Sequence, residues 1–161
     1  MTTTGSDHSP GTFDLRVEHA LPATPEVVFD TYTDADKQIA WLTMDDEEPG
    51  FMEMDVDLRV GGIQDAAWGP TVDQIYHEKQ EFLEIDRPRR LVTTSRSTFA
   101  DGTTSLTRIE MTFDAVGDGH TRVRVEQTGF DDEETRDAFR DAGWPDAFDA
   151  LERYLIRESE S

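Results

Sequence analysis

The chain has 161 residues, of which 36 are acidic and 15 basic, so its formal net charge is −21. Affinity for nucleic acid or for an anionic membrane surface rests on clustered lysine and arginine, and we therefore expect neither as a partner. Cysteine is absent from the sequence, which excludes disulfides and thiolate metal sites.

The length and the apolar pattern predict one domain with a core large enough to enclose a cavity. No apolar run approaches the roughly 18 residues of a membrane span, and the N-terminus MTTTGSDHSPGTFD lacks the regions of a signal peptide. We therefore expect a cytoplasmic protein. The acidic surface indicates solubility through self-repulsion, although the scarcity of lysine is also typical of adaptation to high salt or of a GC-rich genome.

Residues 1–11 are small and polar, and we expect a flexible tail there, followed by a single domain over 12–158. Alternation over 13–19 predicts a first strand. Thr24 suits a helix N-cap and Pro25 the first helical position.

Val27, Val28, Thr31 and Tyr32 are expected to lie on one face of this first helix. A second short helix over 35–42 would bring Ile39 and Trp41 inward. The two segments together predict a bent helix pair directly after the first strand.

Six further segments have the composition or alternation of strands. They are 52–60, 62–69, 72–85, 90–98, 105–115 and 120–129. Asp101-Gly102 and the GDG at 117–119 are hairpin turn signals, and Pro88 lies in a longer turn. Short links between strands predict an antiparallel meander.

The stretch MDVDLRVGG at 54–62 alternates apolar and charged residues up to Val60, which predicts a half-buried strand to that point. Gly61 and Gly62 are expected to supply the backbone angles and close approach of a tight reversal. Arg59 is expected to pair with Asp57 or a neighbouring acid on the solvent side.

At the C-terminus, residues 132–141 predict a short acidic helix, and Gly143 with Pro145 predicts a break. A last helix over 145–157 would then carry Phe148, Leu151 and Leu155 on one face, with Trp144 just before it. We expect that face to pack on the concave side of the twisted sheet.

This order of elements resembles the helix-grip fold of the START-like, or Bet v 1-like, superfamily (SRPBCC). Within it the chain resembles the family of the activator of Hsp90 ATPase homologues, often called AHSA1-like. The stretches that carry the resemblance are LPATPEVVFDTYTD at 21–34, Trp41, DVDLRVGG at 55–62, RPRRLV at 87–92 and TGFDDEETRDAFRDAGWPDAFDALERYL at 128–155. The resemblance implies an α+β fold in which a strongly curved antiparallel sheet of about seven strands wraps around a long C-terminal helix, with a short helix pair after the first strand.

Catalytic and metal signatures are weak. His8, His19, His77 and His120 have no partner at metal-ligand spacing, and no serine lies in a GxSxG motif. Glycine-rich phosphate loops are also missing. The acidic runs at 45–48 and 131–134 lack the spacing of a calcium loop, and we interpret them as solvated loops, the second also as acids at a helix start. We therefore predict no metal, no cofactor and no catalytic residue.

The remaining candidates for a site are bulky residues that the fold would direct between the sheet and the last helix. For each of them, core packing is the competing interpretation. They are Trp41, Met54, Val56, Trp68, Tyr76, Phe113, Phe130, Trp144 and Phe148. Tyr76, Glu84 and Arg96 would add polar groups if their side chains turned inward.

Three functions follow as hypotheses. The superfamily resemblance implies a cavity for a small lipophilic molecule, and this is the function we expect. The alternative is a co-chaperone that acts on an Hsp90-type ATPase, although the name-giving relatives also carry a separate N-terminal domain for which this sequence has no room. A polyketide cyclase-like enzyme is the third, and it would need an acid-base pair that spacing does not identify. A homodimer is a common assembly, but no residue here specifies an interface.

Overall fold

The computed structural model describes residues 12–44, 50–71 and 75–160. Its strands are β1 (Phe13–Leu21), β2 (Phe51–Val56), β3 (Ile63–Gly69), β4 (Tyr76–Asp86), β5 (Arg90–Thr98), β6 (Thr104–Ala115) and β7 (Thr121–Phe130). Its helices are α1 (Pro25–Thr33), α2 (Ala35–Thr43), α3 (Glu133–Ala138), the π-helical turn η1 (Phe139–Gly143) and α4 (Trp144–Ser159). The predicted tail over 1–11 and the acidic run at 45–48 lie outside the described residues.

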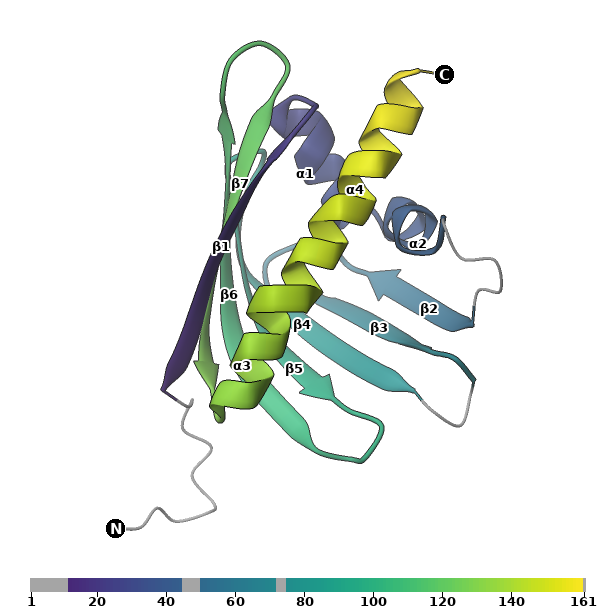
Figure 1. Cartoon of the computed structure of the whole chain (residues 1–161), viewed down its shortest axis with the longest axis vertical. Coiled ribbons are helices and arrows are strands. Elements are labelled where there is room, and N and C mark those ends of the chain that lie inside the picture. Colours follow the sequence, from purple (N-terminus) through teal and green to yellow (C-terminus); the bar gives the residue numbers. More distant parts are fainter. Residues whose placement is uncertain (1–11, 45–49, 72–74, 161) are drawn as a thin grey trace.

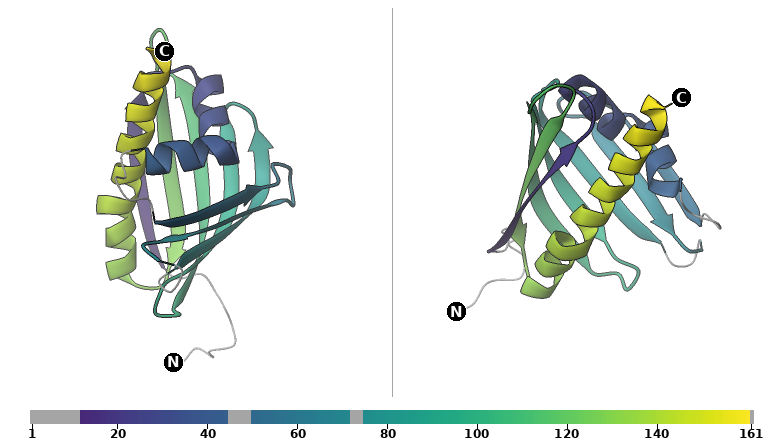
Figure 2. Two further views of the ribbon diagram at one scale, coloured as in Figure 1. Left: turned by 90° about the vertical axis from the view of Figure 1, so that its right-hand side faces the viewer. Right: turned by 45° about the horizontal axis from the view of Figure 1, so that its top comes forward.

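The strands form one antiparallel sheet in the order β1-β7-β6-β5-β4-β3-β2. Figure 1 shows this sheet curving around α4, and Figure 2 shows the helices gathered on its concave face. The predicted helix-grip α+β fold is confirmed. None of the described helices is long and apolar enough to cross a membrane.

Short polar side chains begin the helices at the positions that the sequence indicated. The Thr24 side chain accepts the N–H of Val27, and Asp132 caps α3 by accepting the N–H of Thr135 at 2.6 Å. The face predicted for α1 does not hold at Val27, which is 48% exposed while Val28 and Thr31 are buried. Phe29 is buried as well, because its ring packs edge-on against Phe113 of β6.

The strand predicted to reach Val60 ends at Val56. The reason is a backbone contact with β4, in which the N–H of Gly61 donates to the carbonyl of Phe82 at 2.8 Å and the N–H of Phe82 donates to the carbonyl of Gly62 at 3.0 Å. Gly61 has a φ of 86°, as the reversal requires. The predicted Arg59–Asp57 ion pair is present at 2.8 Å.

The predicted break near Gly143 and Pro145 is wrong, since α3, η1 and α4 follow one another without a gap (Figure 1). The N–H of Trp144 donates to the carbonyl of Phe139, five residues earlier. Such a wider turn accommodates the proline ring, which would otherwise clash with the preceding turn of an α-helix. The first turn of α4 thus continues the direction of α3.

The concave face of the sheet is apolar at one end and polar at the other. Phe113, Val123 and Phe130 are buried with Phe148 and Leu151 of α4 in the apolar part. Toward β3, β4 and β5 the buried side chains are polar instead, among them Gln64, Gln80, Thr93, Ser95 and Ser97. The candidate site lies over this polar part.

Candidate functional site

A cavity of about 530 Å³ lies between the β2–β4 part of the sheet and the helices α2 and α4. A second hollow of about 450 Å³ shares part of the same wall, including Glu78 and Trp144, and extends toward η1. Such volumes are within the usual range for small-molecule sites. Leu42, Gly50 and Pro70 on the wall are exposed, so the cavity opens to solvent at their end.

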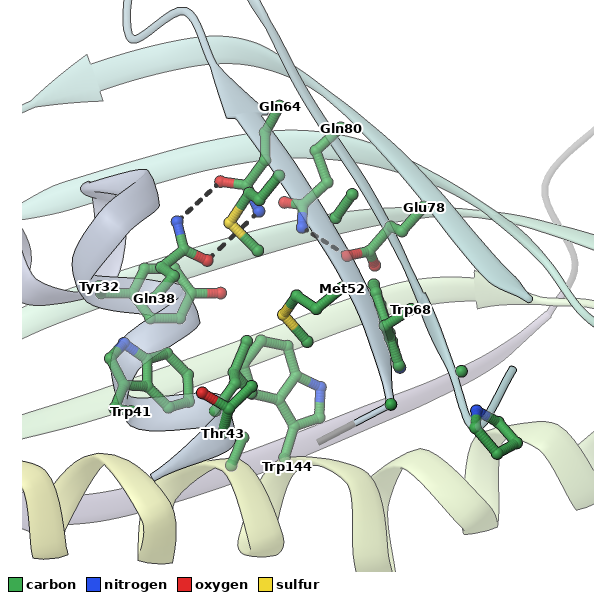
Figure 3. Close-up of a pocket in the computed structure, with 17 residues that line it drawn as sticks. Tyr32, Gln38, Trp41, Thr43, Met52, Gln64, Trp68, Glu78, Gln80 and Trp144 are labelled. Atoms are coloured by element: carbon green, nitrogen blue, oxygen red, sulfur yellow. Dashed lines mark hydrogen bonds between the residues drawn. The ribbon is translucent and has the colours of Figure 1, made fainter. Parts of the chain in front are cut away.

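Aromatic rings from both the helices and the strands line the cavity. All three tryptophans of the sequence, Trp41, Trp68 and Trp144, line it. Tyr32 stacks beside Trp41 with ring centroids 6.4 Å apart, and Trp68 lies 4.3 Å from the ring of Tyr76. Figure 3 shows Trp41 and Trp144 on the helix side.

Two of the indole rings are held in place by hydrogen bonds. The Trp41 N–H donates to the backbone carbonyl of Thr31 at 3.2 Å. The Trp144 N–H donates to the side-chain oxygen of Gln127 at 2.9 Å, and the Gln127 amide donates to the Thr107 hydroxyl at 2.8 Å. These rings are therefore fixed before any ligand arrives, which lowers the entropy cost of binding.

Polar side chains from α2, β3 and β4 also line the cavity. Gln38 of α2 and Gln64 of β3 exchange amide hydrogen bonds of 3.1 and 3.5 Å, and Figure 3 shows both near the cavity roof. Gln80 of β4 accepts the Thr93 hydroxyl at 2.9 Å through its side-chain oxygen. Buried amides in such a network are oriented by their partners, so they present defined donors and acceptors.

Glu78 of β4 is the acid of this wall. Its Oε2 accepts the hydroxyl of Ser95 at 2.8 Å, and its Oε1 accepts the amide of Gln80 at 3.0 Å. Burial raises the pKa of the Glu78 carboxyl, and the two hydrogen bonds offset part of that rise because they favour the ionised form.

Glu78 also acts electrostatically on the hydroxyl groups of Tyr32 and Tyr76. Burial raises the pKa of both phenols, and the negative charge of Glu78 adds to the rise. Both tyrosines therefore stay neutral and able to donate a hydrogen bond near neutral pH. The wall thus combines neutral donors and acceptors with one ionisable carboxyl group.

The comparisons with known proteins identify the family. The model of the activator of Hsp90 ATPase homolog 1-like protein family matches residues 22–156. The chain belongs to this family. The family predicted from the sequence is thereby confirmed. A separate search of curated proteins returned no significant match.

Solved structures of other proteins share this fold. A protein from Rhizobium leguminosarum aligns with a TM-score of 0.78 at 21% identity, covering 92% of this chain and 97% of that one. A protein from Rhizobium loti aligns at 0.75 with 22% identity, covering 91% and 99%. An HSP90 activator from Plasmodium falciparum aligns at 0.54 with 22% identity, covering 74% of each chain. At these identities the likeness concerns the fold alone.

The candidate residues from the sequence fall into separate groups in the structure. Those on the wall of the cavity are Trp41, Met54, Trp68, Tyr76 and Trp144. Phe113, Phe130 and Phe148 lie instead in the packed core, and Val56 lies at a surface hollow beside Asp30. Ligand contact at any of these positions stays a prediction.

Of the polar candidates, Tyr76 turns inward, whereas Glu84 and Arg96 are exposed. Glu84 pairs with Arg90 at 2.8 Å on the outer surface. Sequence reasoning missed Glu78, although the strand YHEKQEF carries the signal. Since Phe82 is buried, period-2 alternation places residues 80, 78 and 76 on the same inner face.

The described residues contain no group of His, Asp and Glu side chains arranged to hold a metal ion. His19 and His77 each contact one carboxylate, of Glu152 and Asp65 respectively, at 2.6 Å. Both pairs join neighbouring elements outside the cavity wall.

Proposed function

We propose that the protein binds a small, largely apolar molecule with one polar end in this cavity. The observation that supports the proposal is that the wall combines aromatic rings, two of them held by hydrogen bonds, with oriented amides and a carboxyl group. Ligand pockets typically combine apolar lining with a few placed polar groups. The apolar body would lie against Trp41 and Trp144, and the polar end would meet the polar side chains of β3 and β4.

Intrinsic fluorescence tests this proposal directly, because every tryptophan of the sequence lines the cavity. The purified protein would be titrated with fatty acids, sterols, flavonoids and polyketide-like aromatics while emission and melting temperature are followed. A ligand at about 100 times its dissociation constant would add about 2.7 kcal/mol to the free energy of unfolding.

A matched pair of variants ties the signal to the cavity. Ala147→Phe places a ring in the cavity from α4, whereas Ala142→Phe makes the same change at an exposed position outside its wall. We expect binding to be lost in the first variant and kept in the second. Equal binding by both variants would contradict the proposal.

A co-chaperone function is the second candidate, and the family match favours it. It would be tested by adding the protein to a purified Hsp90 and measuring ATP hydrolysis. A rise in the rate that survives Ala147→Phe would indicate a protein partner rather than the cavity as the basis of function.

A further inference from the structure

The ionisable charge on the described cavity wall is of negative sign. Among the described residues that line either hollow, none is lysine, arginine or histidine. Glu78 is the acid among them. An anion bound there would face a carboxyl group with no opposing positive charge on the described wall, and burying an unpaired charge is costly.

We infer that the ligand of this cavity is an organic cation, such as a protonated amine on an apolar body, whose charge pairs with Glu78. The inference rests on the proposed ligand-binding function and specifies the chemical class of the ligand. It excludes fatty acids and other carboxylates as the preferred occupants.

The carboxylate of Glu78 retains capacity for such a partner. Each of its oxygens accepts one hydrogen bond, from Ser95 and from Gln80, while an ionised carboxylate offers about four acceptor sites. Glu78 also lines both hollows, so the remaining sites are reachable from the cavity. An ammonium group donates up to three hydrogen bonds and has no acceptor, which complements this arrangement.

The aromatic rings favour a cation as well. Figure 3 shows Trp68 directly beside Glu78, with Tyr32 and Trp144 across the cavity. The face of an indole or phenol ring attracts a cation, and the attraction strengthens where water is excluded. A net charge of −21 further raises the concentration of cations around the protein and lowers that of anions.

Binding of a cation is also expected to release a proton from the carboxyl group of Glu78. Burial raises the pKa of Glu78 in the empty cavity, and a cation beside it favours the ionised form, so binding releases a proton from the fraction of Glu78 that is protonated. The titratable groups that face Glu78 are the phenols of Tyr32 from α1 and Tyr76 from β4, which remain neutral. The described wall residues from β3, α2 and α4 carry no charge. The affinity for an amine is thus expected to rise with pH until Glu78 is fully ionised.

Three probes with one carbon skeleton test the inference: 4-phenylbutylamine, 4-phenylbutan-1-ol and 4-phenylbutanoate. Each would be titrated into the wild-type protein, Glu78→Gln and Glu81→Gln, with tryptophan emission as the readout. Glu81 is exposed on the same strand, so its variant removes the same charge outside the cavity. Melting temperatures of the variants would be measured alongside.

We expect the amine to bind the wild-type protein and Glu81→Gln at least about tenfold more tightly than the alcohol, and the carboxylate to bind weakest. In Glu78→Gln the advantage of the amine over the alcohol would disappear. Calorimetry in buffers of different ionisation enthalpy would show proton release for the amine and none for the alcohol. The ranking of the three probes on the wild-type protein decides the matter even if Glu78→Gln does not fold.

The outcomes separate the two proposals. Binding of the alcohol or the carboxylate as tight as that of the amine, or an amine preference that survives Glu78→Gln, would overturn the cation inference and leave the cavity as a binding site. Absence of binding by all three probes would overturn both.

Discussion

The indole N–H of Trp144 and the side-chain oxygen of Gln127 are joined by a buried hydrogen bond of 2.9 Å. Trp144 begins α4 and Gln127 lies on β7, so this bond fastens the start of the long helix to the strand next to the edge strand β1. A second bond from Gln127 to Thr107 continues the connection to β6. The distance between helix and sheet, and hence the space for the cavity, depends on this chain of contacts.

Trp144→Phe is expected to destabilise the protein by about 1 to 3 kcal/mol beyond the loss of ring area, because the Gln127 oxygen loses its donor. Trp68→Phe is the control, since it removes the same part of an indole that has no hydrogen bond to the described residues. Urea unfolding of both variants would measure the difference. Equal losses would show that the bond contributes nothing.

Gly61→Ala is expected to cost about 1 to 2 kcal/mol, because an L side chain rarely adopts a φ of 86°. Gly62→Ala is expected to cost more, since its Cβ would lie 2.1 Å from the backbone oxygen of Asp57. Chemical denaturation would rank the two. A smaller loss for Gly62→Ala than for Gly61→Ala would mean that the backbone around Asp57 shifts more readily than this close approach indicates.

Gly143→Ala is expected to stabilise the protein by about 0.5 to 1 kcal/mol. Gly143 has a helical φ of −56°, and the nearest atoms to an added Cβ lie 3.8 Å away or more. Alanine would therefore restrict the unfolded chain without a clash. A fall in the thermal midpoint would show that the π-helical turn needs the backbone freedom of glycine at position 143.

Glu78→Gln is expected to change how stability depends on pH. Burial raises the pKa of Glu78 in the folded protein above its ordinary value of 4.5, so the folded state holds the proton more tightly than the unfolded chain does. The contribution of Glu78 to the free energy of unfolding therefore falls as the pH rises from the unfolded to the folded pKa, and it levels off above.

Glutamine cannot ionise, so the stability of Glu78→Gln relative to the wild type should grow with pH across that window. Urea unfolding at intervals from about pH 4 to pH 8 would follow it. Glu81→Gln, at an exposed position, should show no such trend. A constant difference between wild type and Glu78→Gln would mean that Glu78 is hydrated like a surface acid.

The sequence alone predicted the order of elements, because the signals are local. Thr24 and Asp132 cap helices through bonds to residues three positions ahead, and they do so wherever the helix packs. The spacing of Phe148, Leu151 and Leu155 defines one face of α4, and all three are buried. Period and capping therefore sufficed for the order of elements, whereas the fold class and the family followed from the resemblance of stretches such as 21–34 and 128–155 to a known family.

Contacts in the tertiary structure decided where two of the elements end, which the local sequence pattern did not predict correctly. The break expected at Pro145 does not occur, because a bond from Trp144 to Phe139 widens the turn. β2 stops at Val56 because the following turn is bonded to β4, a partner that the local pattern does not reveal.

The cavity itself also depends on tertiary structure. Alternation indicates which face a side chain takes but not what that face meets, so Phe113 and Trp68 were equivalent candidates in the sequence. In the structure Phe113 meets Phe29 of α1 and is packed, whereas Trp68 borders open space under α4. The curvature of the sheet and the anchoring of α4 through Trp144 set that space, and both arise from contacts between residues far apart in the chain.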